Sequence, residues 1–184
     1  MKYNKKNFFI SFEGPEASGK STQINLLKSF FIKNKISHII TREPGGTKIA
    51  EKLRKIILDK KLSITSNEEL LLLMAARLNH INNIIKPALK KGKIVVSDRF
   101  ADSTFVYQGY SNNFGLNKSI KLHKEIINNF LPKKTFLFEI DPKIIISRLN
   151  KRKFKNKYDE KKIEFHKKIL LGYKIISNNK KRFI

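Results

Sequence analysis

The chain has 184 residues, the size of one domain with a sizeable core, and it contains no cysteine. A disulfide framework and a thiolate metal site are therefore excluded. The net charge of +25 raises the question of a polyanion partner, but 33 lysines stand beside 7 arginines, 26 isoleucines, 17 asparagines and 14 phenylalanines. Lys, Ile, Asn and Phe share A/T-rich codons, and selection for a polyanion surface would not enrich isoleucine. We interpret the charge as compositional drift on solvated faces and expect no specific nucleic-acid partner.

The apolar run near the N-terminus ends at Glu13, which is too early for the core of a signal peptide. No other run approaches the length of a membrane span. We therefore expect a cytoplasmic protein without a membrane partner.

Short apolar runs bounded by turn residues predict strands at residues 8–12, 38–41, 94–97, 135–140 and 182–184. Apolar residues at helical spacing predict helices at residues 20–34, 47–60, 67–87, 120–130, 142–150 and 159–177, the third of them capped by Asn67. This alternation predicts a single α/β domain over residues 1–184. Its parallel five-stranded sheet has helices on both faces and a last strand that is short or incomplete.

The stretch FEGPEASGKST (Phe12–Thr22) follows the first strand and opens the first helix. Gly14, Gly19, Lys20 and Ser21 match Gly-x4-Gly-Lys-Ser, the phosphate-binding P-loop of the NTPase-type sheet. Its N–H groups and helix N-terminus suit phosphate oxygens, Lys20 would reach the β- and γ-phosphates, and the Ser21 hydroxyl would bind Mg²⁺. The predicted ATP site comprises Gly14, Pro15, Glu16, Ala17, Ser18, Gly19, Lys20, Ser21 and Thr22. This motif alone leaves ATPases, GTPases and small-molecule kinases open.

Two further clusters, TREPGGT (Thr41–Thr47) and SDRF (Ser97–Phe100), follow the second and third strands. Both lie at the sheet edge where open α/β sheets bind ligands. Arginine is scarce here, so Arg42 and Arg99 indicate a need for the planar guanidinium, as in a second phosphate site. Asp98 ends an apolar strand where its carboxylate can reach Mg²⁺ held by Ser21.

Together with AAR, IKPALKKGKIVVSDRF, DSTFVYQG and FLFEIDP, these motifs make the sequence resemble the bacterial thymidylate kinases over nearly the whole chain. TREPGGT and DRF-x2-S-x3-YQG are specific to that family, whereas the P-loop is widely shared. The resemblance implies transfer of the γ-phosphoryl group of ATP to dTMP, with Mg²⁺ as cofactor, giving dTDP for dTTP synthesis. It leaves a monomer and a homodimer both open.

The resemblance also implies roles on the dTMP side. Glu16 would accept a hydrogen bond from the 3′-hydroxyl, and Tyr107 would disfavour a 2′-hydroxyl. A cis peptide bond between Glu43 and Pro44 would turn Arg42 inward. The implied dTMP-binding residues are Glu16, Arg42, Leu73, Arg77, Arg99, Ser103, Tyr107 and Gln108. Of these, Leu73 stands where the family has a phenylalanine that stacks on thymine, so the base loses an aromatic face and keeps only an apolar contact.

The P-loop interior has no basic residue, so the resemblance assigns that charge to a lid at about residues 148–160. Arg148 and Arg152 match the family's arginines on the lid side. Lys157 replaces the arginine of the family's Asp-Arg-x-Glu element, which weakens the expected stabilisation of the transition state. The implied catalytic residues are Lys20, Arg99, Arg152 and Lys157, and the implied metal ligands are Ser21 and Asp98.

Three alternatives stay open on the sequence. The first is a kinase for another pyrimidine nucleoside monophosphate, which Leu73 allows. The second is a P-loop ATPase stimulated by nucleic acid, and the third is an inactive remnant. The chain's last residue, Ile184, falls near the start of the family's last strand, which leaves the completeness of the adenine site open.

Overall fold

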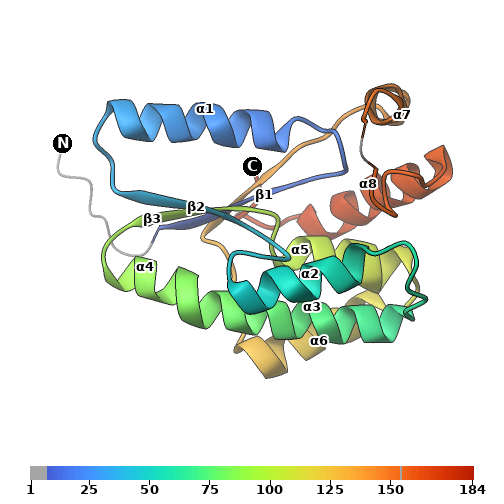
Figure 1. The fold of residues 1–184 in the computed structure, drawn as a ribbon, viewed down its shortest axis with the longest axis horizontal. Coiled ribbons are helices and arrows are strands. Elements are labelled where there is room, and N and C mark those ends of the chain that lie inside the picture. The colour runs from blue at the N-terminus through green and yellow to red at the C-terminus, as the bar shows by residue number, and fades with distance from the viewer. Residues whose placement is uncertain (1–7, 154) are drawn as a thin grey trace.

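The computed structural model describes residues 8–153 and 155–184 (Figure 1). Within these ranges, four strands form one parallel sheet in the order β2-β3-β1-β4. They are β1 (Phe9–Glu13), β2 (His38–Arg42), β3 (Ile94–Asp98) and β4 (Lys134–Leu137). The helices are α1 (Lys20–Lys33), α2 (Lys48–Leu58), α3 (Ser66–His80), α4 (Lys86–Lys90), α5 (Ala101–Thr104), α6 (Leu116–Ile127), α7 (Pro142–Asn150) and α8 (Ile163–Ser177), with π-helical segments η1 (Ile81–Ile85) and η2 (Phe105–Ser111).

The α/β class and the parallel sheet are confirmed, but the fifth strand is wrong. Residues 182–184 form only a single bridge, between Phe183 and Thr135 of β4. The Phe183 N–H donates to the carbonyl of Lys180, so a turn closes just before the bridge. Arg182 and Ile184 exchange backbone hydrogen bonds with Thr135 and Leu137, but these form no ladder beyond the single bridge.

Several predicted helix bounds also need correction. Thr65, and not Asn67, caps α3, because its hydroxyl accepts from the Glu68 N–H while the Glu68 carboxylate accepts from the Thr65 N–H. The helix does not stop at Pro87 but continues through η1 into α4. A wider π turn before Pro87 relieves the clash of its ring with the preceding turn. Helix α8 begins at Ile163, four residues later than predicted, and the helical stretch 101–111 was not predicted.

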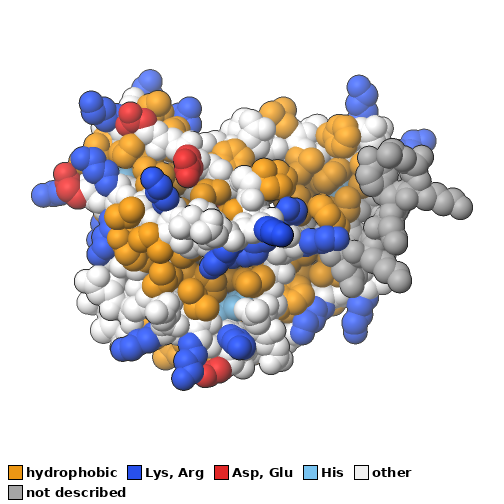
Figure 2. All heavy atoms as spheres, turned by 180° about the vertical axis from the view of Figure 1, so that it is seen from behind, with side chains coloured by type: hydrophobic (Ala, Val, Ile, Leu, Met, Phe, Trp, Pro, Cys, Tyr) orange, Lys and Arg blue, Asp and Glu red, His pale blue; other side chains and the backbone are white. Residues whose placement is uncertain are grey.

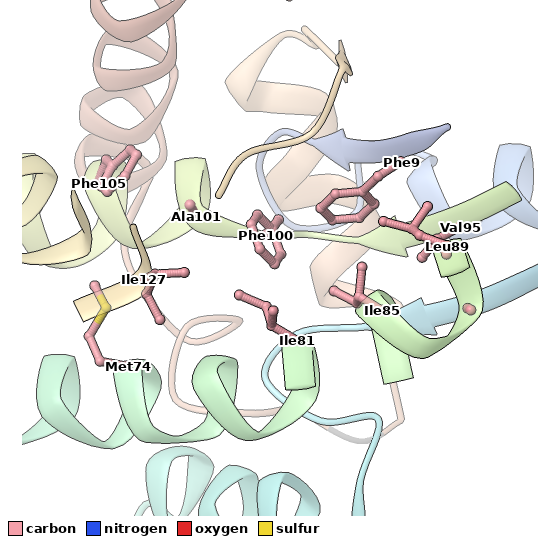
Figure 3. Packing of buried hydrophobic residues seen from close by; sticks show 11 residues of the cluster. Phe9, Met74, Ile81, Ile85, Leu89, Val95, Phe100, Ala101, Phe105 and Ile127 are labelled. Atoms are coloured by element: carbon pink, nitrogen blue, oxygen red, sulfur yellow. The ribbon is translucent and has the colours of Figure 1, made fainter. Parts of the chain in front are cut away.

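The strands alternate their apolar side chains between the two faces of the sheet. Phe9 and Val95 face a cluster with Met74, Ile81 and other residues of α3, η1 and α4 (Figure 3). Phe100 joins this cluster edge-on to Phe9, with ring centroids 4.9 Å apart. On the opposite face, Ile10, Phe12 and Val96 pack against Ile24 and Phe31 of α1. Figure 1 shows α1 and, further along, α7 on one side of the sheet and the α2–α6 layer on the other.

The topology brings three strand ends together. Asp98 at the end of β3 is the register partner of Phe12 in β1 and of Arg42 in β2. The P-loop follows β1, so it lies directly beside Asp98. The chain runs from β1 to one side of the sheet and from β3 to the other, which makes this edge the switch point where such sheets bind ligands.

Figure 2 shows lysines and arginines scattered over one face, in its middle as well as at its margins, among apolar side chains. Among the described residues, no helix combines the length and apolarity that crossing a bilayer requires.

Candidate active site

The P-loop bends sharply at both of its glycines. Gly19 caps α1 with a φ of 99°, a conformation that favours glycine. Gly14 has a φ of 135°, and a β-carbon there would lie 2.5 Å from the carbonyl oxygen of Phe138. A side chain would therefore strain the backbone at Gly19 and clash at Gly14. Glycine at both positions lets the loop adopt the shape in which its backbone N–H groups can bind phosphate.

Lys20 is the first residue of α1 and folds back into the loop. Its Nζ donates to the carbonyls of Pro15 (2.6 Å) and Gly14 (3.1 Å), and to the Ser18 hydroxyl (3.2 Å). Burial, with repulsion from Arg99, lowers the pKa of Lys20 to about 7, although Glu16 and other carboxylates raise it in part. A polyphosphate in the loop would restore the lysine's full charge.

Ser21 and Asp98 meet as the strand ends predict. The Ser21 hydroxyl donates to Asp98 Oδ2 at 2.9 Å. A hydroxyl and a carboxylate beside a phosphate site are the hard oxygen donors that Mg²⁺ prefers, and Mg²⁺ takes few protein ligands when phosphates complete its shell. The donor chemistry at this position therefore fits Mg²⁺.

Arg99 lies between the P-loop and η2. It adopts a positive φ of 69°, and its guanidinium donates to Glu16 (2.8 Å), to the Gly14 carbonyl (2.8 Å) and to Ser103 (3.0 Å). Glu16 also accepts from the Tyr107 hydroxyl at 2.6 Å. Burial alone would raise the pKa of Glu16, but Arg99 and Lys20 outweigh it and hold the pKa below its usual range. Glu16 is therefore an ionised acceptor at the point where the two halves of the site meet.

Beneath Arg99 lies a second buried carboxylate, Glu13. It accepts from the Phe100 N–H and the Ser103 hydroxyl, both at 2.6 Å, and from the Tyr173 hydroxyl at 3.0 Å. Burial and the nearby Asp102 raise the pKa of Glu13 to about 7. It ties the P-loop strand to the segment that carries Arg99 and Ser103.

Arg77 is fully buried on α3 and also lines the cavity. Its guanidinium donates to Glu43 at 2.7 Å and to the Thr104 hydroxyl at 2.7 Å. Glu43 accepts on its other oxygen from His80 at 3.0 Å. Leu73 lies one helical turn before Arg77 and lines the same cavity. A rigid guanidinium beside an apolar wall is suited to a planar polar ring.

Arg42 lies elsewhere. The Glu43–Pro44 bond is cis, as the resemblance suggests, but Arg42 pairs with Glu51 at 3.0 Å and is 56% exposed. The arginine of α2 that lines the cavity is Arg54, whose guanidinium donates to the Pro44 carbonyl at 2.8 Å. The prediction from sequence omitted Arg54, although the scarcity of arginine in this chain was a signal that applied to it equally.

The predicted lid, at about residues 148–160, contacts both halves of the site. Arg148 donates to the P-loop carbonyl of Ala17 at 2.9 Å. Arg152 pairs with Asp159 at 2.8 Å within the lid, and Lys157 pairs with Glu69 of α3 at 2.7 Å. Phe154, which lies inside the predicted lid, is outside the described residues. The pair with Glu69 places Lys157 on the acceptor side of the cavity. The sequence predicted no partner for Lys157 there.

One cavity of about 850 Å³ joins these parts. Its lining includes P-loop residues 16–22, Asp98 and Arg99 at the end of β3, Leu73 and Arg77 of α3, Ser103, Tyr107 and Gln108, and Arg148, Arg152 and Tyr158 of the lid. A phosphate cradle thus faces a second cationic pocket with an apolar wall. The fold and this site define a P-loop phosphotransferase that holds two phosphorylated molecules face to face.

Comparison with known proteins specifies the family. The thymidylate kinase family model matches residues 12–184. A curated thymidylate kinase of Geobacillus sp. (strain WCH70) is 42% identical over 171 residues, which is 91% of this chain and 81% of that protein. One of Rickettsia africae is 42% identical over 174 residues, 95% and 85% of the two chains. The crystal structure of thymidylate kinase from Ehrlichia chaffeensis superposes with a TM-score of 0.76 at 34% identity, covering 97% of this chain and 86% of that one. The chain belongs to the thymidylate kinase family.

Proposed function

We propose that the protein transfers the γ-phosphoryl group of ATP to dTMP, giving dTDP for dTTP synthesis in the cytoplasm. The single observation that carries this proposal is the shared cavity. In it the P-loop faces a wall that contains Arg99, Arg77 and Leu73. Family membership supports the same reaction.

On the donor side, the P-loop N–H groups and Lys20 bind the ATP phosphates. Ser21 and Asp98 would hold Mg²⁺, which would neutralise charge on the transferring phosphoryl group. Arg148 and Arg152 approach from the lid. Because the chemistry of phosphoryl transfer is mostly positioning and charge stabilisation, these residues need only place cations around the reacting oxygens.

On the acceptor side, Arg99 binds the dTMP phosphate, and Arg54 or Arg42 supplies the second cation. Glu16 accepts from the 3′-hydroxyl, and Tyr107 lies beside the sugar. Arg77 reads the base while Ser103 and Gln108 complete the pocket. Leu73 gives the base an apolar contact in place of an aromatic stack.

The test is ADP release with ATP and Mg²⁺ in the presence of dTMP, dUMP, dCMP, UMP or no acceptor. We expect a signal that depends on dTMP and is abolished in Lys20→Ala and Arg99→Ala. Equal rates with dUMP would instead favour a broader pyrimidine nucleotide kinase. Hydrolysis that needs no acceptor but rises with polynucleotide would move the assignment to an ATPase, and no activity from a folded sample would indicate a remnant.

A further inference from the structure

Glu69 is a buried carboxylate that the reaction as described does not use. It lies on α3 with 4% of its surface exposed, one helical turn before Leu73 and two turns before Arg77. All three side chains line the same cavity. A carboxylate at this depth is stable only if other groups supply charge and hydrogen bonds.

Three donors converge on Glu69 from distant parts of the chain. Gln108 Nε2 of η2 donates to Oε1 at 2.7 Å, and Lys157 Nζ of the lid donates to Oε2 at 2.7 Å. The Tyr158 hydroxyl, also of the lid, donates to Oε1. Burial and the Glu69 carboxylate raise the pKa of Tyr158, so its phenol remains a donor. A single carboxylate therefore connects the acceptor pocket to two consecutive lid residues.

Besides its hydrogen bond to Glu69, Tyr158 contributes its ring to the cavity wall. The ring packs edge-on against Tyr107, with centroids 5.3 Å apart, and stacks on Phe165 of α8 at 6.2 Å. Tyr107 is itself fixed by Glu16. The lid thus supplies an aromatic side chain to a pocket whose helical wall carries the aliphatic Leu73.

We infer that Glu69 is a positioning residue that latches the lid onto the acceptor pocket and thereby completes the base-binding wall. Acting through Lys157 and Tyr158, it makes affinity for dTMP depend on lid closure. It also fixes the Gln108 amide, whose Nε2 is bonded to Glu69 and whose Oε1 is left as the acceptor. In this arrangement Lys157 acts mainly through Glu69 and contributes little at the transferring phosphate. The inference deepens the proposed function and rests on it for the identity of the acceptor.

The lid offers a readout that is independent of turnover. Residues 151–162 contain many trypsin sites, among them Lys155, Lys157 and Lys161. If Glu69 latches this segment, Glu69→Gln exposes it, and we expect cleavage within 151–162 to become several-fold faster by mass spectrometry. Glu125→Gln is the matched control, because Glu125 is an exposed carboxylate of α6 outside the cavity lining. Its cleavage pattern should equal that of the wild type.

Binding and kinetics test the acceptor half of the inference. By calorimetry, Glu69→Gln should weaken dTMP binding about tenfold or more, and KM for dTMP should rise far more than KM for ATP. Tyr158→Phe keeps the ring and removes only the hydroxyl, so KM for dTMP should rise about two- to tenfold. This variant replaces Glu69→Gln in the test if Glu69→Gln does not fold. Tyr110→Phe, outside the cavity lining, is its control.

A double-mutant comparison separates the two roles of Lys157. If Lys157 acts through Glu69, Lys157→Met should add little to Glu69→Gln. An equal fall in kcat from Lys157→Met in both backgrounds, with KM for dTMP unchanged, would overturn the inference. So would unchanged cleavage and dTMP affinity in Glu69→Gln. Faster cleavage in a protein that does not bind dTMP would uphold the latch and refute the proposed acceptor.

Discussion

The Glu43–Arg77 pair offers a direct test of how the acceptor pocket is built. Both side chains are almost fully buried, at 4% and 2% exposed, and Arg77 Nε lies 2.7 Å from Glu43 Oε2. Glu43→Gln removes the charge but keeps the shape. Burial alone would raise the pKa of Glu43, yet Arg77 and His80 hold it below its usual range, so the carboxylate is ionised in the native protein. The variant therefore leaves the Arg77 guanidinium buried without a counter-charge.

Breaking a buried pair in this way costs about 3–5 kcal/mol of unfolding free energy. For a chain of this length, that corresponds to a fall in Tm of about 6–20 °C. Lys60–Glu160 is the matched control, since its side chains are 42% and 51% exposed. An exposed pair contributes about 0–1 kcal/mol, so Glu160→Gln should shift Tm by a few degrees at most.

Urea unfolding followed by circular dichroism, at low and at high salt, measures both variants. The loss in Glu43→Gln should persist at 1 M salt, because the pair is shielded from solvent ions. The lowered pKa of Glu43 also sets how the stability depends on pH. A lowered native pKa stabilises the protein above the usual pKa of a glutamate, and this contribution disappears as the pH falls through the native pKa. A cost in Glu43→Gln no larger than that in Glu160→Gln would refute the reasoning.

Four further predictions concern the active site. Because the pKa of Lys20 is about 7, binding of Mg–ATP should take up close to one proton at pH 8 and much less at pH 6. Calorimetry in buffers of different ionisation enthalpy measures this uptake. Proton uptake that does not depend on pH would contradict the prediction, and Lys20→Met should abolish the uptake. Asp98→Asn should raise the Mg²⁺ concentration for half-maximal rate about tenfold, and an unchanged requirement would remove Asp98 from the metal site. Leu73→Phe should lower KM for dTMP about two- to tenfold by adding an aromatic stack, whereas a higher KM would show that the pocket has no room for the ring. Arg54→Met should raise KM for dTMP more than Arg42→Met does, since only Arg54 lines the cavity; the reverse order would show that Arg42 leaves Glu51 on binding.

Local sequence patterns were sufficient for most of the fold. The first helix was predicted to within one residue and α7 without error, because turn residues bound their apolar patterns clearly. The segment Ala101–Ser111 was missed, since its aromatic and β-branched residues carry no helical spacing that stands out. It is helical because Phe105 and Val106 are buried between the sheet layer and α8. Tertiary burial overrides weak local preference there.

The phosphate site could be predicted from the sequence because a P-loop is local. Its glycines, lysine and hydroxyl lie within eight residues, and the adjoining strand and helix position them. The sequence also indicated that Asp98 would meet Ser21, since parallel strands end at a common edge. Which arginines line the cavity opposite the P-loop, in contrast, depends on tertiary packing. The sequence favoured Arg42, which follows a strand, and gave Arg54 no role. In the structure Arg42 pairs with Glu51, whereas Arg54 donates to the Pro44 carbonyl.

The burial of Glu43 and Glu69 also depends on contacts between distant parts of the chain. Nothing near Glu43 or Glu69 in the chain shows that either is buried, because their partners lie 34 to 89 residues away. A charge pair of this kind depends on how α3, η2 and the lid pack against one another, and packing is not encoded in any short window. The sequence therefore determined the chemistry that holds ATP, whereas the assembly of distant elements decided the shape and charge of the pocket opposite it.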